Sequence, residues 1–160
     1  MPEPILDPAY WERRLKRAKQ LHHSIYLCPH DEWLAIEERH RQILASIVQP
    51  QDAILDIGCG YGRLLTLLPS HWQGKYLGVD LSPDLIALAK ATHKDRDFVV
   101  ADARTLQCDV FDLAVLISIR PMLKRNCTED VWTAMEQRVH SCAKKVLYLE
   151  YDRNDEGSLE

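Results

Sequence analysis

The spacing of hydrophobic and polar positions follows two different patterns along the chain, and the pattern changes near residue 50. Before that point, apolar side chains recur at spacings of three and four over residues 8–21 and again over residues 31–48. This is the period of an α-helix with one apolar face. Pro50 closes the second stretch. We therefore predict two helices within residues 1–50, which would form an N-terminal helical lid.

Beyond residue 50, short apolar runs alternate with helical patterns. The runs that predict strands cover residues 53–57, 75–79, 97–101, 111–118 and 145–151. The helical patterns between them cover residues 63–68, 83–92 and 128–141, and Ser82-Pro83 supplies an N-cap and a first-turn proline for the second of these. Strands that alternate with helices predict an α/β fold of the Rossmann-like, doubly wound type, with a mainly parallel sheet of about five strands. Residues 51–160 would be its core, within one domain overall.

Polar and glycine residues follow several of these predicted strands. The first strand leads into residues 58–62, the second ends at Asp80, the third at Asp102 and the fourth at Ser118. The carboxyl ends of parallel strands lie at one edge of a sheet, and ligands bind there beside the switch in strand order. The sequence therefore predicts one crevice bordered by these residues.

The composition excludes several classes of function and leaves the predicted fold unchanged. The chain has 160 residues, 46% of them hydrophobic, and its net charge of −4 argues against a surface built to neutralise many phosphates. The basic run at residues 13–17 is best explained as the solvated face of a helix. Five cysteines without a CxxC pair predict a reducing, cytoplasmic location and no zinc site. No apolar run approaches the roughly 20 residues of a membrane span.

The glycine-rich loop carries the most specific signal. Its pattern is Gly58-x-Gly60-x-Gly62, whereas the dinucleotide fingerprint is GxGxxG. Asp56, two residues before the first glycine, would repel a pyrophosphate but suits a ligand with a cationic amino-acid end. Asp80 can accept hydrogen bonds from both hydroxyls of a ribose. Asp102 can accept one from an adenine amino group.

Four blocks in this order resemble the motifs of class I S-adenosylmethionine-dependent methyltransferases. They are residues 54–63, 78–83, 98–103 and 111–118, and the resemblance extends over about residues 53–151. It implies S-adenosylmethionine as the cofactor, with its methionine end framed by the glycine loop, its ribose on Asp80, and its adenine beside Leu81. The cofactor-binding residues expected are Asp56, Gly58, Cys59, Gly60, Gly62, Asp80, Leu81, Asp102, Ala103 and Ser118.

The methyl acceptor is less well indicated. Residues 118–121 lack the Asn/Asp/Ser-Pro-Pro-aromatic motif of enzymes that methylate amino groups of nucleic acids, so a small-molecule acceptor with an O, N or C nucleophile is favoured over nucleic acid. Methyl transfer can rest on positioning and exclusion of water, so no catalytic residue and no metal is assigned. The candidates for substrate contact are Tyr10, Trp11, Arg120 and Tyr151. Arg120 would bind an anionic group or form a structural salt bridge.

The chain departs from the family pattern at its end. A complete domain of this class has seven strands, and the nine residues after Tyr151 are too few for the usual antiparallel hairpin. The terminal hairpin is therefore expected to be missing, with the N-terminal helices, a homodimer partner or another subunit covering the sheet edge, unless the chain is a fragment. Two alternatives stay open: an RNA or protein methyltransferase that docks its substrate on residues 13–17, and a non-catalytic methyltransferase-like subunit that needs a partner.

Overall fold

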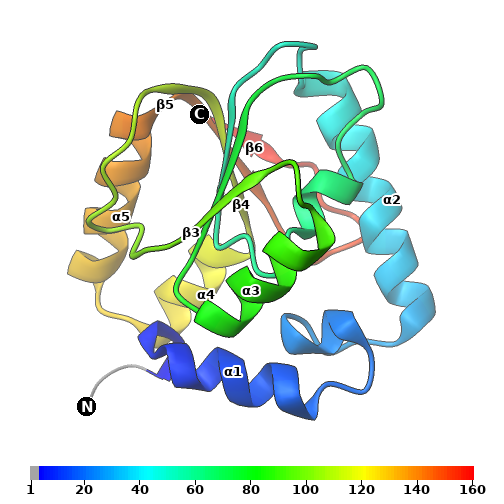
Figure 1. The fold of residues 1–160 in the computed structure, drawn as a ribbon, viewed down its shortest axis with the longest axis vertical. Coiled ribbons are helices and arrows are strands. Elements are labelled where there is room, and N and C mark those ends of the chain that lie inside the picture. Colours follow the sequence, from blue (N-terminus) through cyan, green and yellow to red (C-terminus); the bar gives the residue numbers. More distant parts are fainter. Residues whose placement is uncertain (1–3) are drawn as a thin grey trace.

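The sheet at the centre of the computed structural model, which describes residues 4–160, has six strands (Figure 1). They are β1 (Ile54–Ile57), β2 (Tyr76–Asp80), β3 (Asp97–Val100), β4 (Phe111–Ile117), β5 (Ala143–Leu149) and β6 (Ser158–Leu159). Their order is β3-β2-β1-β4-β5-β6, and the first five are parallel. Since β1 is flanked by β2 and β4, the strand order switches direction there. The predicted doubly wound, mainly parallel fold is confirmed.

Residues 4–160 also form five α-helices and three short 3-10 helices. The α-helices are α1 (Pro8–Arg17), α2 (His30–Ile47), α3 (Pro83–Thr92), α4 (Ile119–Asn126) and α5 (Glu129–Cys142), and the 3-10 helices are η1 (Pro4–Leu6), η2 (Leu21–Ser24) and η3 (Arg63–Thr66).

Three predictions need correction. The first helix ends at Arg17 rather than near residue 21, residues 63–66 form a 3-10 turn rather than an α-helix, and α4 was not predicted at all. Pro121 is compatible with α4 because it lies in the first turn, where a backbone N–H has no partner within the helix.

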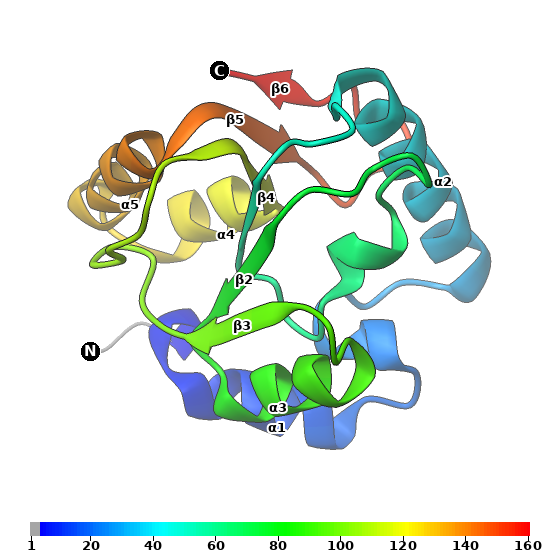
Figure 2. The same cartoon turned by 45° about the horizontal axis from the view of Figure 1, so that its top comes forward.

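Helices cover both faces of the sheet, and the alternation of side chains along the strands decides which helix each residue meets. Val115 of β4 packs in the same cluster as Leu44 of α2. Its neighbour Leu116 packs on the other face with Trp132 of α5. Figure 2 shows α2 and α5 on opposite sides of the sheet. The near-continuous apolar sequence of β4 follows from this burial on both faces.

The far edge of β5 is covered by the chain itself. β6 pairs antiparallel with β5, with Leu159 opposite Leu147 and Ser158 opposite Tyr148. Among the described residues, β6 is the one strand after β5, so the usual two-strand terminal hairpin is missing as expected, and this short antiparallel strand adds to the predicted sheet of about five. A tight turn makes the return possible: Asp155 accepts hydrogen bonds from Glu150 N and Gly157 N, and Gly157 has a φ of 71°.

His40 of α2 ties this helix to the end of β5. The imidazole is fully buried, and its Nε2 donates to the carbonyl oxygen of Glu150 at 2.7 Å. Its Nδ1 therefore accepts from the guanidinium of Arg63 at 3.1 Å. Burial and the neighbouring Arg63 lower the pKa of His40 to about 4, so the ring is neutral. His40 is thus a neutral, hydrogen-bonded core residue.

The predicted lid does not behave as one unit. α2 contributes Ile43 and Leu44 to the main core, whereas α1 lies against α3 at one end of the molecule (Figures 1 and 2). The division at residue 50 into a lid and a core remains a prediction. Within residues 4–160, no helix is both long and apolar enough to cross a membrane.

The packing of α2 makes a direct prediction about stability. Leu44→Ala should lower the free energy of unfolding by about 2–5 kcal/mol, because it leaves a cavity beneath the sheet. The matched control is Leu34→Ala on the same helix, where the side chain is 50% exposed and the change should stay within about 0.5 kcal/mol. Denaturant unfolding measures both. Equal effects of the two substitutions would contradict the assignment of α2 to the core.

Candidate functional site

A cavity of about 330 Å³ opens at the carboxyl ends of β1, β2 and β4. This volume lies in the usual range of small-molecule sites. The lining residues from the strands and the segments directly after them are Gly58, Gly60, Asp80, Leu81, Ile117, Ser118 and Tyr151. Those from the helices and from the segment after η2 are Ile5, Tyr10, Trp11, Arg14, Ile25, Tyr26, Leu85, Ile119, Met122, Arg125 and Asn126. A smaller recess of about 70 Å³ shares Asp80 and Leu81 with the cavity and reaches Asp102 and Ala103. The crevice predicted from the strand ends is present.

The glycine loop forms the floor of the cavity. Gly58, Gly60 and Gly62 have φ values of 68°, 55° and 84°, in the left-handed region that side chains disfavour. At Gly58 a Cβ would also lie 2.5 Å from the side chain of Ile119. Gly58 and Gly60 line the cavity, whereas Gly62 does not and instead begins η3. The loop therefore presents bare backbone to a ligand.

Asp80 is fixed at the lip of the cavity by the backbone around it. Its Oδ2 accepts a hydrogen bond from Gly60 N at 2.8 Å, and its Oδ1 accepts one from Ser82 N at 2.9 Å. Burial raises the pKa of Asp80, and these N–H donors act against that rise. Each carboxylate oxygen keeps a further lone pair, so Asp80 can still accept hydrogen bonds from a ligand.

Asp56 lies beneath the loop rather than in the cavity. The side chain is 2% exposed and accepts a hydrogen bond from the Tyr76 hydroxyl at 2.7 Å. Burial raises the pKa of Asp56 to about 7, and the bond from Tyr76 opposes the rise. Asp56 is thus separated from the cavity lining, and its role toward a cationic ligand end stays a prediction.

Cys59 is also outside the lining. The thiol is buried beside the loop, and burial raises its pKa well above the ordinary value, which leaves no reactive thiolate. Cys59 was expected among the cofactor-binding residues, and since it does not line the cavity, that role stays a prediction.

Asp102 and Ala103 border the recess as predicted from the end of β3. The Asp102 carboxylate is paired with Arg104, whose Nη2 lies 2.6 Å from Oδ2, and it also accepts from Arg104 N. An adenine amino group in the recess would therefore share this carboxylate with Arg104.

Ser118 ends β4 in a strained conformation. Its φ is 55°, the one positive value outside glycine among residues 4–160. Its Oγ accepts from Tyr151 N at 2.7 Å and donates to Glu150 Oε2 at 3.3 Å. Such strain costs about 1–3 kcal/mol and clusters at functional sites. The Ser118 turn thus connects the ends of β4 and β5 at the cavity.

Aromatic side chains form a further part of the cavity wall. Tyr10 and Trp11 of α1 line the cavity, with their rings 5.0 Å apart in an edge-to-face arrangement. Tyr151 lines it from the sheet side and stacks on Tyr26 at 4.8 Å. Three of the four predicted substrate candidates are therefore brought together.

Arg120 is the fourth candidate, and the structure places it elsewhere. Its guanidinium lies 3.6 Å from the centre of the Tyr148 ring, and its Nη2 pairs with Glu160 at 2.7 Å and Glu136 at 3.4 Å. The salt-bridge alternative is the one observed, since α4 turns this side chain away from the cavity.

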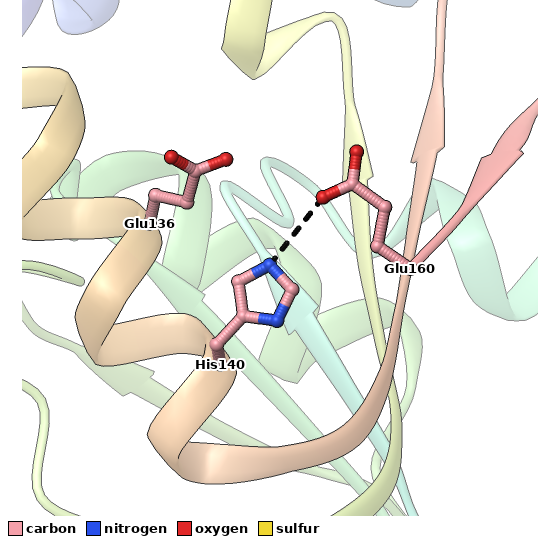
Figure 3. A group of neighbouring side chains, drawn as sticks. All are labelled: Glu136, His140 and Glu160. Atoms are coloured by element: carbon pink, nitrogen blue, oxygen red, sulfur yellow. Dashed lines mark ion pairs between the residues drawn. The ribbon is translucent and has the colours of Figure 1, made fainter.

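The partners of Arg120 belong to a small surface cluster. Glu136, His140 and Glu160 each offer a ligand-type atom within 4.8 Å of the others (Figure 3). The sequence predicts no metal site. A cation could bind here only by displacing Arg120 from both carboxylates.

The sequence patterns did not indicate several of the residues that line the cavity. Arg14 was read as part of a solvated basic run, yet it lies four residues after Tyr10 and hence on the same face of α1. Met122, Arg125 and Asn126 were missed because α4 was missed. The signal for α4 was Pro121 followed by basic residues in the last turn.

Comparison with known proteins identifies the family. The family model described as "Methyltransferase domain" matches residues 54–145, more than half of the chain. The chain belongs to this methyltransferase domain family. The recognition made from the motifs is confirmed.

Relatives of this methyltransferase domain differ from it in length. Trans-aconitate 2-methyltransferase of Escherichia coli O157:H7 is 37% identical over 68 residues, which are 41% of this chain and 27% of that protein. Malonyl-[acyl-carrier protein] O-methyltransferase of Anoxybacillus flavithermus is 30% identical over 118 residues, 73% of this chain and 40% of that protein. The chain thus spans between a quarter and two fifths of the length of these curated relatives.

Solved structures share the fold of the methyltransferase domain. The magnesium protoporphyrin IX methyltransferase of Synechocystis PCC 6803, solved with bound S-adenosylmethionine, has a TM-score of 0.64 at 18% identity, covering 92% of this chain and 76% of that one. A TehB-like S-adenosylmethionine-dependent methyltransferase from Corynebacterium glutamicum has a TM-score of 0.61 at 24% identity, covering 89% and 73%. At these identities the likeness concerns the fold alone.

The raised pKa of Asp56 predicts how the stability of the protein depends on pH. Its pKa is 3.8 in the unfolded chain and about 7 in the folded protein, so between these values the folded state holds a proton that the unfolded state has lost. Asp56 therefore lowers stability as pH rises from about 4 to about 7, by at most ~1.4 kcal/mol per pH unit. Asp56→Asn removes this contribution, so the variant should gain stability relative to the wild type across that range.

Chemical denaturation at a series of pH values measures the difference. Tyr76→Phe serves as the companion variant: without the hydroxyl donor the pKa of Asp56 should rise further, and the loss of stability should continue to higher pH. A difference between Asp56→Asn and the wild type that stays constant with pH would show that Asp56 ionises normally.

Proposed function

We propose that this chain transfers a methyl group from S-adenosylmethionine to an O, N or C nucleophile of a small molecule. The observation that carries the proposal is the Asp80 carboxylate, held by Gly60 N and Ser82 N at the lip of a cavity whose floor is a glycine loop. Family membership supplies the reaction class.

The residues present fit this cofactor. The bare backbone of Gly58 and Gly60 leaves space that a Cβ would fill, so the methionine end can approach the loop closely. Asp80 keeps lone pairs for the two ribose hydroxyls, and bidentate hydrogen bonding to a carboxylate suits a vicinal diol. Leu81 and Ala103 offer apolar contacts for the adenine, and Asp102 an acceptor for its amino group.

Methyl transfer requires little of the protein beyond holding the cofactor and the acceptor in the right positions. When bound, S-adenosylmethionine would supply an activated methyl group to the acceptor. The lone pair of the acceptor forms the new bond to the methyl carbon, and the electron pair of the old carbon–sulfur bond stays on the sulfur. Tyr10, Trp11 and Tyr151 would exclude water and fix the direction of attack. We assign no general base.

A small acceptor is favoured by the cavity itself, which is walled by side chains from both ends of the chain. Two of the curated relatives are named for trans-aconitate and for malonyl-[acyl-carrier protein]. An RNA or protein acceptor would instead dock on the exposed residues of α1, among them Arg13, Lys16 and Arg17. A steep salt dependence of RNA binding would favour that alternative.

Two further proposals concern the surroundings of the site. We propose a cytoplasmic location, on the five free cysteines. A homodimer or a partner subunit would be expected to use the open edge of β3, where Val99 and Val100 are 37% and 47% exposed, since β6 already covers part of β5.

Replacing Asp80 tests the cofactor site. Asp80→Ala should weaken binding of S-adenosylmethionine and of S-adenosylhomocysteine by about 1–3 kcal/mol, or roughly 5- to 150-fold, because the ribose hydroxyls lose their acceptor. Isothermal titration calorimetry measures both affinities.

The matched control is Asp95→Ala, which removes the same charge from an exposed position outside the cavity. Its affinity should equal that of the wild type. Equal binding by Asp80→Ala and the wild type would remove Asp80 from the site, and no binding by the folded wild type would contradict the proposed function.

A further inference from the structure

The charged residues of the cavity are mostly basic. Among residues 4–160, the lining includes one carboxylate residue, Asp80, beside the glycine loop. It also includes two arginines, Arg14 and Arg125, which come from α1 and α4 and neither of which belongs to the loop or lines the recess. The charged side chains of the lining therefore carry a net positive charge.

Arg14 is held in place without an acidic partner. Its Nη1 lies 3.4 Å from the Tyr10 hydroxyl, and its Nη2 donates to the carbonyl oxygen of His23 at 3.4 Å. The guanidinium also lies 5.5 Å from the centre of the Trp11 ring. In the described part of the chain no carboxylate lies within ion-pair distance of Arg14. Its neighbours orient the group but leave its charge uncompensated.

Arg125 reaches the same cavity from α4. It lies beside Asn126 in the last turn, and its side chain is exposed. The charge of Arg125 acts on Glu150, whose Oε2 already accepts a hydrogen bond from Ser118. No carboxylate of residues 4–160 forms an ion pair with Arg125, so this guanidinium also remains available.

The same cavity is lined by flat rings. Tyr10, Trp11, Tyr26 and Tyr151 all line it, with Ile25 and Met122 beside them. Aromatic walls favour a flat ligand body, and guanidinium groups favour an oxyanion because their planar donors match two oxygens at once.

We propose that the methyl acceptor is a flat, unsaturated small molecule with an oxyanion, either a carboxylate or a phosphate, and that Arg14 and Arg125 bind this oxyanion. The inference rests on the proposed function, because it names the class of acceptor at that site. The arginines anchor the acceptor, while its nucleophilic atom points toward the glycine loop.

Three matched probes test the charge preference: trans-cinnamate, phenyl phosphate and the uncharged cinnamamide. Each is titrated into the isotope-labelled protein and followed by two-dimensional NMR, once alone and once with saturating S-adenosylhomocysteine. At least one anion should bind in the millimolar range or tighter, and cinnamamide should bind at least about fivefold more weakly. The two anions separate a carboxylate site from a phosphate site.

Substitution of each arginine identifies the groups responsible. Arg14→Met and Arg125→Met should each weaken anion binding by about three- to tenfold and leave the affinity for cinnamamide and for S-adenosylhomocysteine unchanged. The controls are Arg13→Met and Lys124→Met, which remove a charge from the neighbouring exposed position of the same helix. They should leave anion binding unchanged.

The outcomes separate this inference from the proposed function. If S-adenosylhomocysteine binds but cinnamamide binds as well as the anions, or if the arginine and control variants behave alike, the acceptor class is wrong and the methyltransferase proposal stands. If the anions bind in an arginine-dependent way and S-adenosylhomocysteine does not bind, the oxyanion site stands and the cofactor assignment falls.

Discussion

The cavity depends on the hydrogen bonds that Asp80 accepts at the end of β2. One oxygen takes the N–H of Gly60, and the other takes that of Ser82. Ser82 in turn caps α3 through its hydroxyl and Leu85 N. A single carboxylate thus fixes the glycine loop, the strand and the next helix relative to one another, and it does so at the position where a ribose would need an acceptor. Binding and local folding share the same group.

The fold could be predicted from the sequence where local pattern and tertiary packing agree. The strands were recognisable because burial on both faces demands continuous apolar runs such as that of β4, and the loop because Gly58, Gly60 and Gly62 occupy left-handed positions. α4 and β6 were missed for a physical reason. The first begins with Ile119-Arg120-Pro121, which suggests a loop, and the second exists only because Asp155 holds the turn that brings the tail back.

The candidate site was predictable on its cofactor side and much less so on its acceptor side. Asp80, Leu81 and Ala103 follow strands directly, so their place in the chain gives their place in space. The position of a helical residue in the sequence does not give the direction of its side chain, because that direction depends on which face of the helix packs against the protein. For that reason Arg14 was assigned to solvent although it faces the cavity, and Arg120 was considered for the substrate although it stacks on Tyr148.

The stack of Tyr26 on Tyr151 joins the two ends of the sequence in one wall. During synthesis, Tyr26 is made long before Tyr151, and β1, β2, β3, β4 and β5 all lie between them in the chain. A contact of such long sequence separation must close a large loop, which slows its formation. This part of the cavity wall therefore cannot be completed until the chain has been made as far as Tyr151.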